Sequence, residues 1–160
     1  MNPLTPANFN SELLVIGYGN TLRRDDGVGP KVAEAIESQK LPGVRVIVCH
    51  QLTPELAELI SQSRAVVFVD ADAKAKGEVK LREIEAGDAG QILAHATDPR
   101  SLLGLARQLF GRNPKAWSLA IPVEDLGFGD GLSPRAAAGS EIAVREIQSL
   151  AAFEQAKNAW

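Results

Sequence analysis

Apolar and polar positions along the chain form alternating blocks that predict strands separated by helices. A short continuous apolar run at 13–17 predicts a strand covered on both faces, and further strands are predicted at 44–49, 65–70 and 117–122. Between them, apolar residues recur at helical spacing and predict helices at 28–40, 54–63, 98–111 and from 133 onward. The segment GEVKLREIE at 77–85 instead alternates apolar and charged residues. This pattern is typical of a half-exposed antiparallel edge strand, whose Lys and Arg would discourage pairing with another sheet edge.

Capping residues sharpen the bounds of two of these helices. Thr53 followed by Pro54 predicts an N-cap and a first-turn proline for the helix at 54–63. The next helix is expected to begin at Asp98 and Pro99 and to end at Gly111. Its expected apolar stripe consists of Leu102, Leu103, Ala106, Leu109 and Phe110.

The alternation of strands and helices predicts an α/β fold. We expect three layers: a mainly parallel, twisted sheet of about five strands with one antiparallel edge strand, and helices on both faces. A single domain over 12–155 would follow a flexible arm at 1–11 and precede a tail at 156–160. In such folds the ligand site lies at the carboxyl ends of the strands.

Composition narrows the class of protein. The 160 residues are 45% hydrophobic and 23% charged, which excludes a disordered chain, and a net charge of −3 argues against nucleic acid as the main partner. The single cysteine, Cys49, excludes an internal disulfide. The first residues lack a signal-peptide pattern, and no apolar run approaches the length of a membrane span. We therefore expect a cytoplasmic protein that does not bind membranes.

The loop after the first predicted strand carries a glycine-rich segment and two adjacent aspartates, Asp25 and Asp26. A dinucleotide fingerprint would need a small residue where Leu22 stands, and the aspartates would repel a phosphate at the following helix. The sequence also lacks a glycine followed by Lys and Ser or Thr at the spacing of a Walker loop. For the aspartates alone, two interpretations stay open: either one caps the helix and the other is solvated, or they contribute to a site.

Other candidate residues come at the ends of the next strands. Asp70 ends the third strand, His50 follows the second, and His95 precedes the helix at 98–111. Carboxylates and an imidazole from separate loops could form an open site for a divalent transition metal. No serine sits in a G-x-S-x-G elbow, and Cys49 belongs to an apolar strand. These features favour metal chemistry or metal recognition over a covalent nucleophile.

Three sequence blocks together resemble the nickel-iron hydrogenase maturation endopeptidases. The first is LLVIGYGNTLRRDDGVGPKVAEAI, with the G-x-G-N and D-[DE]-G-x-G motifs of that family. The second is AVVFVDADAKAKGEV, and the third, HATDPRSLLGLARQLFG, resembles the family's histidine segment. The resemblance extends from about Leu13 to Leu150. The segment HQLTPELAELI together with DPRSLLGLA resembles the branch that acts on bidirectional, NAD(P)-linked hydrogenases.

This resemblance implies a function. The family removes a short C-terminal peptide from the precursor of the hydrogenase large subunit after nickel insertion. The chain would be a cytoplasmic, aspartic-type and metal-dependent endopeptidase, a monomer whose partner is that precursor. Its nickel would be supplied by the precursor. The family's metal-contacting and catalytic positions fall on Asp26, Asp70 and His95, with His50 as the fallback for His95.

The resemblance also suggests substrate-binding positions, namely Gly17, Gly19, Asn20, Asp25, Gly27 and Gly29. For the glycines, turn geometry alone is an equally good explanation. Two other functions remain open: a non-enzymatic, nickel-binding chaperone in hydrogenase assembly, and a small α/β hydrolase or nucleotide-binding domain that carries the GYGN loop by coincidence.

Overall fold

The computed structural model describes residues 12–87 and 98–158 of the 160-residue chain. The arm expected at 1–11 and the segment that contains His95 lie outside the described residues. In chain order the elements are β1 (Leu13–Tyr18), the 3₁₀ helix η1 (Arg24–Gly27), α2 (Val28–Gln39), β2 (Val44–Cys49), α3 (Leu56–Ser61), β3 (Ala65–Asp72), β4 (Lys80–Ile84), α4 (Pro99–Phe110), β5 (Lys115–Pro122) and α5 (Pro134–Asn158).

The five strands form one sheet in the order β2-β1-β3-β5-β4. All neighbouring pairs are parallel except β4 and β5, so the expected antiparallel edge strand is confirmed. From β1 the chain passes to β2 on one side and then returns to β3 on the other side of β1. The carboxyl ends of β1 and β3 therefore border the crevice where the strand order reverses, which is the usual ligand site in such sheets.

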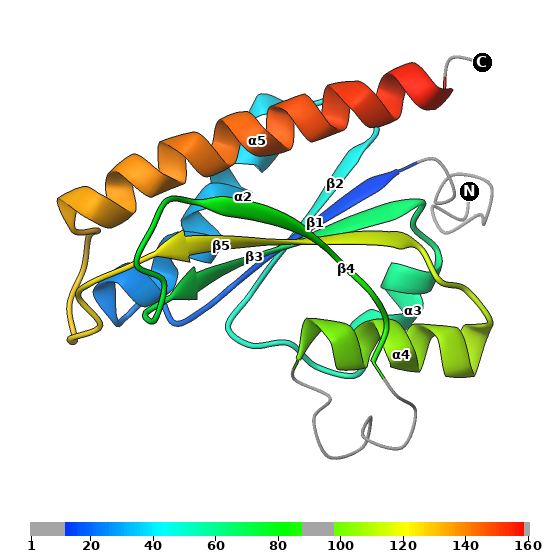
Figure 1. The fold of residues 1–160 in the computed structure, drawn as a ribbon, viewed down its shortest axis with the longest axis horizontal. Helices are drawn as coiled ribbons and strands as arrows, with labels where there is room; N and C mark the ends of the chain where they lie inside the picture. Colours follow the sequence, from blue (N-terminus) through cyan, green and yellow to red (C-terminus); the bar gives the residue numbers. More distant parts are fainter. Residues whose placement is uncertain (1–11, 88–97, 159–160) are drawn as a thin grey trace.

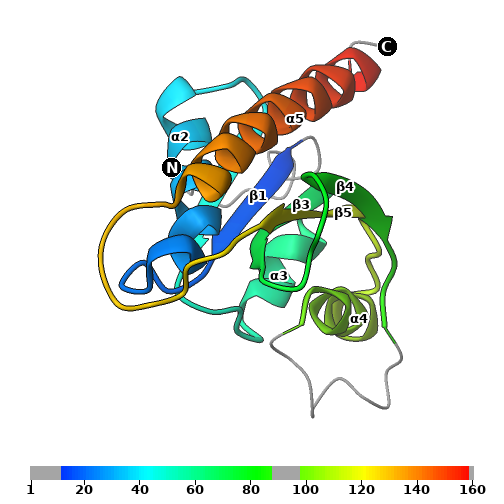
Figure 2. The ribbon, with the colours of Figure 1, turned by 60° about the vertical axis from the view of Figure 1, so that its left-hand side comes forward.

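Helices cover both faces of the sheet, as the sequence predicts (Figures 1 and 2). Alternation along β1 sends Leu13 and Val15 into the core beneath α2 and α5, and Leu14 and Ile16 into the core beneath α3 and α4. Both cores are closed by the apolar stripes of their helices. On the α2 and α5 side these residues include Val28, Val32, Ile36, Ala143, Ile147 and Leu150.

The expected bounds of α4 are confirmed at both ends. The Asp98 side chain accepts a hydrogen bond from the Arg100 amide at 2.8 Å, and Gly111 ends the helix with a φ of 69°. The expected stripe is only partly correct, because Leu109 and Phe110 are 62% and 44% exposed. Their spacing is helical, but the helix extends beyond the surface on which it packs, so its last turn meets solvent.

Two other helix bounds differ from expectation. Helix α3 begins at Leu56 with Glu55 as its N-cap rather than Thr53. The Thr53 carbonyl instead accepts a hydrogen bond from the Leu56 amide at 3.1 Å, which closes a separate turn. Helix α5 continues to Asn158, so the tail expected from 156 is helical over its first residues. Among the described residues no helix is both long and apolar enough to cross a bilayer.

Candidate functional site at the carboxyl ends of β1 and β3

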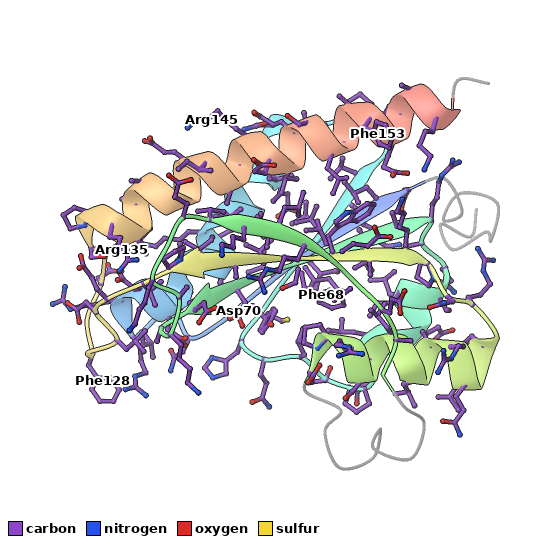
Figure 3. The ribbon with its side chains drawn as sticks, viewed as in Figure 1. Phe68, Asp70, Phe128, Arg135, Arg145 and Phe153 are labelled. Atoms are coloured by element: carbon purple, nitrogen blue, oxygen red, sulfur yellow. The ribbon has the colours of Figure 1, made fainter. Side chains whose placement is uncertain are left out.

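Asp70 and Tyr18 come together from neighbouring strands at the topological crevice. Tyr18 follows Leu14 and Ile16 on one face of β1, and Asp70 continues the matching face of β3 beyond Phe68. The Tyr18 hydroxyl donates a hydrogen bond to Asp70 Oδ2 at 3.0 Å. Asp70 does not end the strand as expected, because β3 continues to Asp72; it follows the apolar residues of β3, and one of its oxygens accepts from the Tyr18 hydroxyl (Figure 3).

The surroundings of Asp70 change its acidity. Burial raises the pKa of this carboxyl from 3.8 to about 6, although the hydrogen bond from Tyr18 acts in the opposite direction. The negative charge of Asp26 contributes to the increase. Burial and the charge of Asp70 also raise the pKa of Tyr18, so the phenol stays protonated and continues to donate. Asp70 thus exchanges its proton close to neutral pH.

Asp26 is positioned by the loop that follows β1. The Asn20 amide donates to Asp26 Oδ2 at 2.8 Å, while the Asn20 side chain accepts a hydrogen bond from the Leu22 amide at 2.9 Å. Within the described residues, Oδ1 of Asp26 accepts no hydrogen bond and is free for another ligand. The interpretation that one aspartate caps the helix is wrong: the N-cap of α2 is Gly27, without a side-chain hydrogen bond.

Asp25 is fully buried and ties this loop to the segment after β5. Its carboxylate accepts hydrogen bonds from the Glu124 and Asp125 amides, both at 3.0 Å, and from the amide and hydroxyl of Ser133, both at 2.7 Å. Burial alone would raise the pKa of Asp25, but these hydrogen bonds outweigh it and lower the pKa. The structure shows a positioning contact; direct binding of substrate by Asp25 stays a prediction.

Packing accounts for the glycines of the first motif. A Cβ on Gly29 would lie 2.5 Å from the Val69 carbonyl oxygen and 2.6 Å from that of Tyr18. A Cβ on Gly17 would overlap Gly29, and one on Gly19, which has a φ of 149°, would overlap the Asp26 carbonyl. These glycines let α2 and η1 approach the ends of β1 and β3. Substrate contact by Gly17, Gly19, Asn20, Gly27 and Gly29 stays a prediction.

The metal-binding set is incomplete in the described part of the chain. Over residues 12–87 and 98–158, no three His, Cys, Asp or Glu side chains converge as they would around a metal ion. His50 follows β2 and is exposed, while His95 lies outside the described residues. The structure places Asp26 near enough to Asp70 for its charge to raise the pKa of Asp70, and the histidine ligand stays a prediction.

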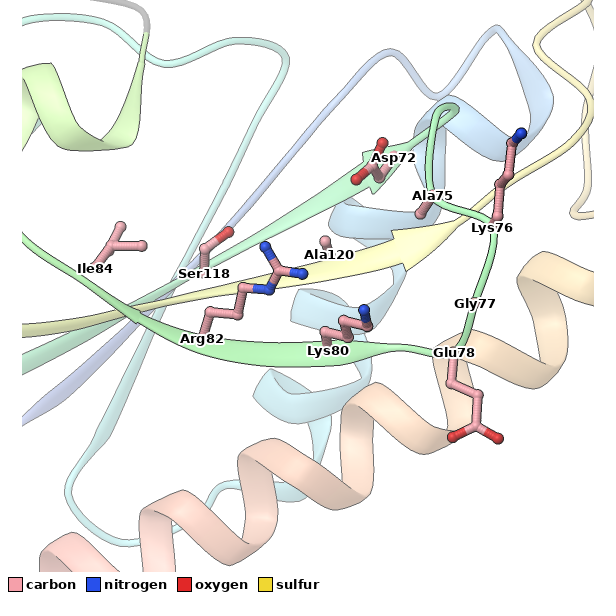
Figure 4. A pocket seen from close by; sticks show the side chains of 10 residues that line it. All are labelled: Asp72, Ala75, Lys76, Gly77, Glu78, Lys80, Arg82, Ile84, Ser118 and Ala120. Carbon is pink, nitrogen blue, oxygen red and sulfur yellow. The ribbon is translucent and has the colours of Figure 1, made fainter.

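A hollow of about 350 Å³ lies over β4 and β5 and is bordered on the β3 side by Asp72; Asp70 is not one of its lining residues. Ala120, which lies opposite Asp70 in the register of β3 and β5, is part of its floor together with Ser118. Lys80 and Arg82 of β4 extend over this floor, and Asp72 stands at its β3 side (Figure 4). The hollow is large enough for a few side chains of an extended peptide.

Two features of the site are absent from the sequence-based prediction. Tyr18 could have been identified, because strand alternation places it on the same face as Asp70. The segment 123–133 has no periodic pattern, and its contact with Asp25 joins residues about one hundred positions apart. No local signal predicts that contact.

Comparison with known proteins gives structural matches only. No protein-family model matches the chain, and no curated protein matches its sequence. The solved structure of the hydrogenase maturating endopeptidase HybD from E. coli is similar over 91% of this chain and 93% of its own, with 26% identity and a TM-score of 0.64. The [NiFe] hydrogenase maturation protease HybD from Thermococcus kodakarensis is similar over 88% and 99%, with 24% identity and a TM-score of 0.69.

An uncharacterized protein from Wolinella succinogenes is also similar, with 26% identity, a TM-score of 0.60, and coverage of 89% of this chain and 97% of its own. The matches extend over nearly the whole of each chain. The resemblance to hydrogenase maturation endopeptidases that the sequence motifs indicate is therefore confirmed. The similarity to one particular branch of that family stays a prediction.

Proposed function

We propose that this chain is a hydrogenase maturation endopeptidase that removes the C-terminal peptide of a nickel-loaded large-subunit precursor. The observation that carries this proposal is the coincidence of two independent features. The chain shares the fold of the E. coli endopeptidase over 91% of its length, and two carboxylates stand at the crevice that this fold uses for ligands.

Nickel enters this proposal as part of the substrate. Oδ1 of Asp26 and the carboxylate of Asp70 are oxygen donors for a divalent cation already held in the precursor, and a histidine would supply the third ligand. A precursor without nickel would lack the ion that these groups recognise. The two aspartates would thereby restrict cleavage to precursor that has received its metal.

The hollow over β4 and β5 offers room for the reacting chain next to this crevice. Peptide hydrolysis adds one water molecule: its oxygen bonds to the carbonyl carbon, the C–N bond breaks, and a proton passes to the leaving amine. The hollow would hold the segment next to that bond. A metal ion so placed would polarise the carbonyl or the water. Because a carboxyl must lose its proton to bind metal, processing should decline as the pH falls below about 6.

The test compares nickel-loaded with nickel-free precursor. Each is incubated with the purified chain, and the mass of the large subunit is measured. Loss of a C-terminal peptide from the loaded form alone supports the proposal. An unchanged mass in both forms contradicts it, and retention of nickel by the chain itself would then favour the chaperone.

Variants assign the ligands. Asp26→Asn and Asp70→Asn should each abolish cleavage, whereas Glu34→Gln on the exposed surface of α2 should not alter it. Separate His95→Ala and His50→Ala variants identify the histidine. Normal cleavage by His95→Ala together with loss in His50→Ala would reverse our assignment.

A further inference from the structure

Two large apolar side chains project into solvent next to the candidate site. Phe128 is 80% exposed and Leu22 is 73% exposed, the largest exposures among the exposed large apolar residues of the described chain. Phe128 lies at one end of the molecule (Figure 3). We call these two side chains the apolar knob. Isolated exposed apolar residues are common on protein surfaces, and these two are distinguished by how their loops are held.

The backbone beneath the knob is firmly connected. The Gly129 amide donates to the Leu22 carbonyl at 2.9 Å, and the Arg24 amide donates to the Gly129 carbonyl at 3.2 Å. These bonds join the loop after β1 to the loop after β5, which lie side by side in Figure 2. The buried Asp25 links the same two loops from below.

The Phe128 ring has a cation above it. The Arg23 guanidinium carbon lies 5.1 Å from the ring centroid, and Arg23 Nε donates to the Leu126 carbonyl at 3.0 Å. Both apolar side chains are therefore presented by an ordered surface. Binding through such a surface loses little conformational entropy, which favours affinity.

The knob is also coupled to the site by the chain itself. Leu22 is two residues from Asn20, whose amide holds Asp26, and the Leu22 amide bonds the Asn20 side chain. A macromolecule bound at Asp26 would therefore lie beside the loop that carries Leu22. The rim carries both signs of charge, because Arg24 pairs with Asp125 at 3.7 Å. A rim of this kind suits a protein surface better than an anionic membrane.

We propose that the apolar knob docks into an apolar pocket on the large-subunit precursor and so supplies binding energy away from the scissile bond. This inference rests on the proposed function. Phe and Leu side chains that become fully buried at the centre of an interface can dominate its affinity. The knob would act on precursor with or without nickel, because it contacts protein rather than metal.

The test measures the affinity of the chain for purified nickel-free precursor, which the proposed function leaves uncut. Phe128→Ser and Leu22→Ser should each weaken binding by about tenfold or more. The matched control for Phe128→Ser is Phe153→Ser, because Phe153 is 57% exposed on α5 with Lys157 Nζ 5.4 Å from its ring centroid. The control for Leu22→Ser is Leu109→Ser, at 62% exposure on α4. Both controls should retain wild-type affinity.

The experiment must distinguish a variant whose loop has lost its order from one that has lost only the docking contact. Phe128→Leu removes the ring beneath Arg23 but keeps an apolar side chain, so it should retain most of the affinity, and all variants should keep the wild-type melting temperature. Wild-type affinity in both knob variants would overturn the inference. The inference would also be overturned if the wild type showed no measurable binding. A wild-type homodimer that Phe128→Ser dissociates would overturn it too, because the knob would then contact a second copy of the chain. If the wild type also fails to cut nickel-loaded precursor, the proposed function fails as well.

Discussion

Two aspartates in the same region of the molecule are driven to opposite protonation behaviour by their neighbours. Asp25 is fully buried, but three backbone amides and the Ser133 hydroxyl donate to its carboxylate, and these hydrogen bonds stabilise its charge and lower its pKa. Asp70 has only a phenol and one backbone amide against its burial, so its pKa rises. The number of donors, rather than burial alone, decides which carboxylate stays ionised. Asp25 is thereby suited to structure and Asp70 to chemistry.

Replacement of Asp70 should reveal a pH-dependent cost of its charge. The fold raises its pKa from 3.8 to about 6, so between these values the native state binds more protons than the unfolded state. The stabilisation that protonated Asp70 gives to the native state is therefore complete below pH 3.8 and is lost as the pH rises through about 6. At about pH 7.5 the ionised Asp70 carboxylate lowers the free energy of unfolding by up to about 3 kcal/mol. Asp70→Asn avoids this cost, and its side-chain oxygen still accepts the hydrogen bond from the Tyr18 hydroxyl.

Urea unfolding of the metal-free chain between about pH 4 and pH 8 measures this difference. We expect Asp70→Asn to exceed the wild type in free energy of unfolding by about 1 to 3 kcal/mol at the upper end and to match it at the lower end. Asp130→Asn, on an exposed loop residue, should show no such trend. An advantage of Asp70→Asn that does not change with pH would contradict the assigned cause.

Asp25→Ala should destabilise the chain substantially. The change leaves three backbone amides and the Ser133 hydroxyl without their acceptor beneath the loop at 123–133. Because each unsatisfied buried donor costs about 1 to 3 kcal/mol and some will reach water, we expect a loss of about 3 kcal/mol in the free energy of unfolding. Chemical denaturation checks this value. Asp130→Ala in the same loop should change it by less than about 0.5 kcal/mol.

At the scale of elements, close backbone contact fixes where α2 begins relative to the sheet. Gly29 in the first turn of α2 lies against the carbonyl oxygens of Tyr18, the last residue of β1, and Val69, near the end of β3. This contact sets the position of η1 and hence of Asp26. The glycine motif therefore shapes the candidate site indirectly, through the approach of a helix to two strand ends.

Gly29→Ala tests this role. The added methyl would sit 2.5 and 2.6 Å from two backbone oxygens that cannot move independently of the sheet. We expect α2 to shift outward, at a cost of about 1 to 3 kcal/mol measured by denaturant unfolding. The control is Gly77→Ala, whose Cβ would meet nothing within 4 Å and which should be close to neutral. Equal stability of the two variants would remove packing as the explanation for Gly29.

The elements themselves are largely predictable from the sequence because their signals are local. Apolar runs locate β1, β2 and β3, alternation identifies β4, and Asp98 with Gly111 marks both ends of α4. The exposure of Leu109 and Phe110 is not predictable, because it depends on where the surface under α4 stops. In the site, Asp26 is predictable from its position in the loop after β1 and Asp70 from its position after the apolar run of β3, although that strand continues to Asp72. The anchoring of Asp25 does not, since its partners are distant in sequence and lie in a segment without periodicity.

At the scale of the whole molecule, topology separates binding from chemistry while it keeps them adjacent. Where the strand order reverses between β1 and β3, Asp26 lies near enough to Asp70 for its charge to raise the pKa of Asp70. The loops that follow β1 and β5, which are hydrogen-bonded to each other, carry the apolar knob, and the first of them also carries Asp26. A large substrate can therefore be held by one part and cleaved at the other. Each part should then leave its own kinetic signature.

Steady-state cleavage of nickel-loaded precursor distinguishes these parts. Phe128→Ser removes a contact made equally in the ground state and the transition state, so KM should rise by about tenfold while kcat stays close to wild type. Asp70→Asn removes a group that the proposed function places at the reacting centre, so kcat should fall by at least about a hundredfold. Phe153→Ser, remote on α5, should change neither constant. If Phe128→Ser instead lowers kcat at unchanged KM, the knob acts in the chemical step, and the separation of docking from cleavage is wrong.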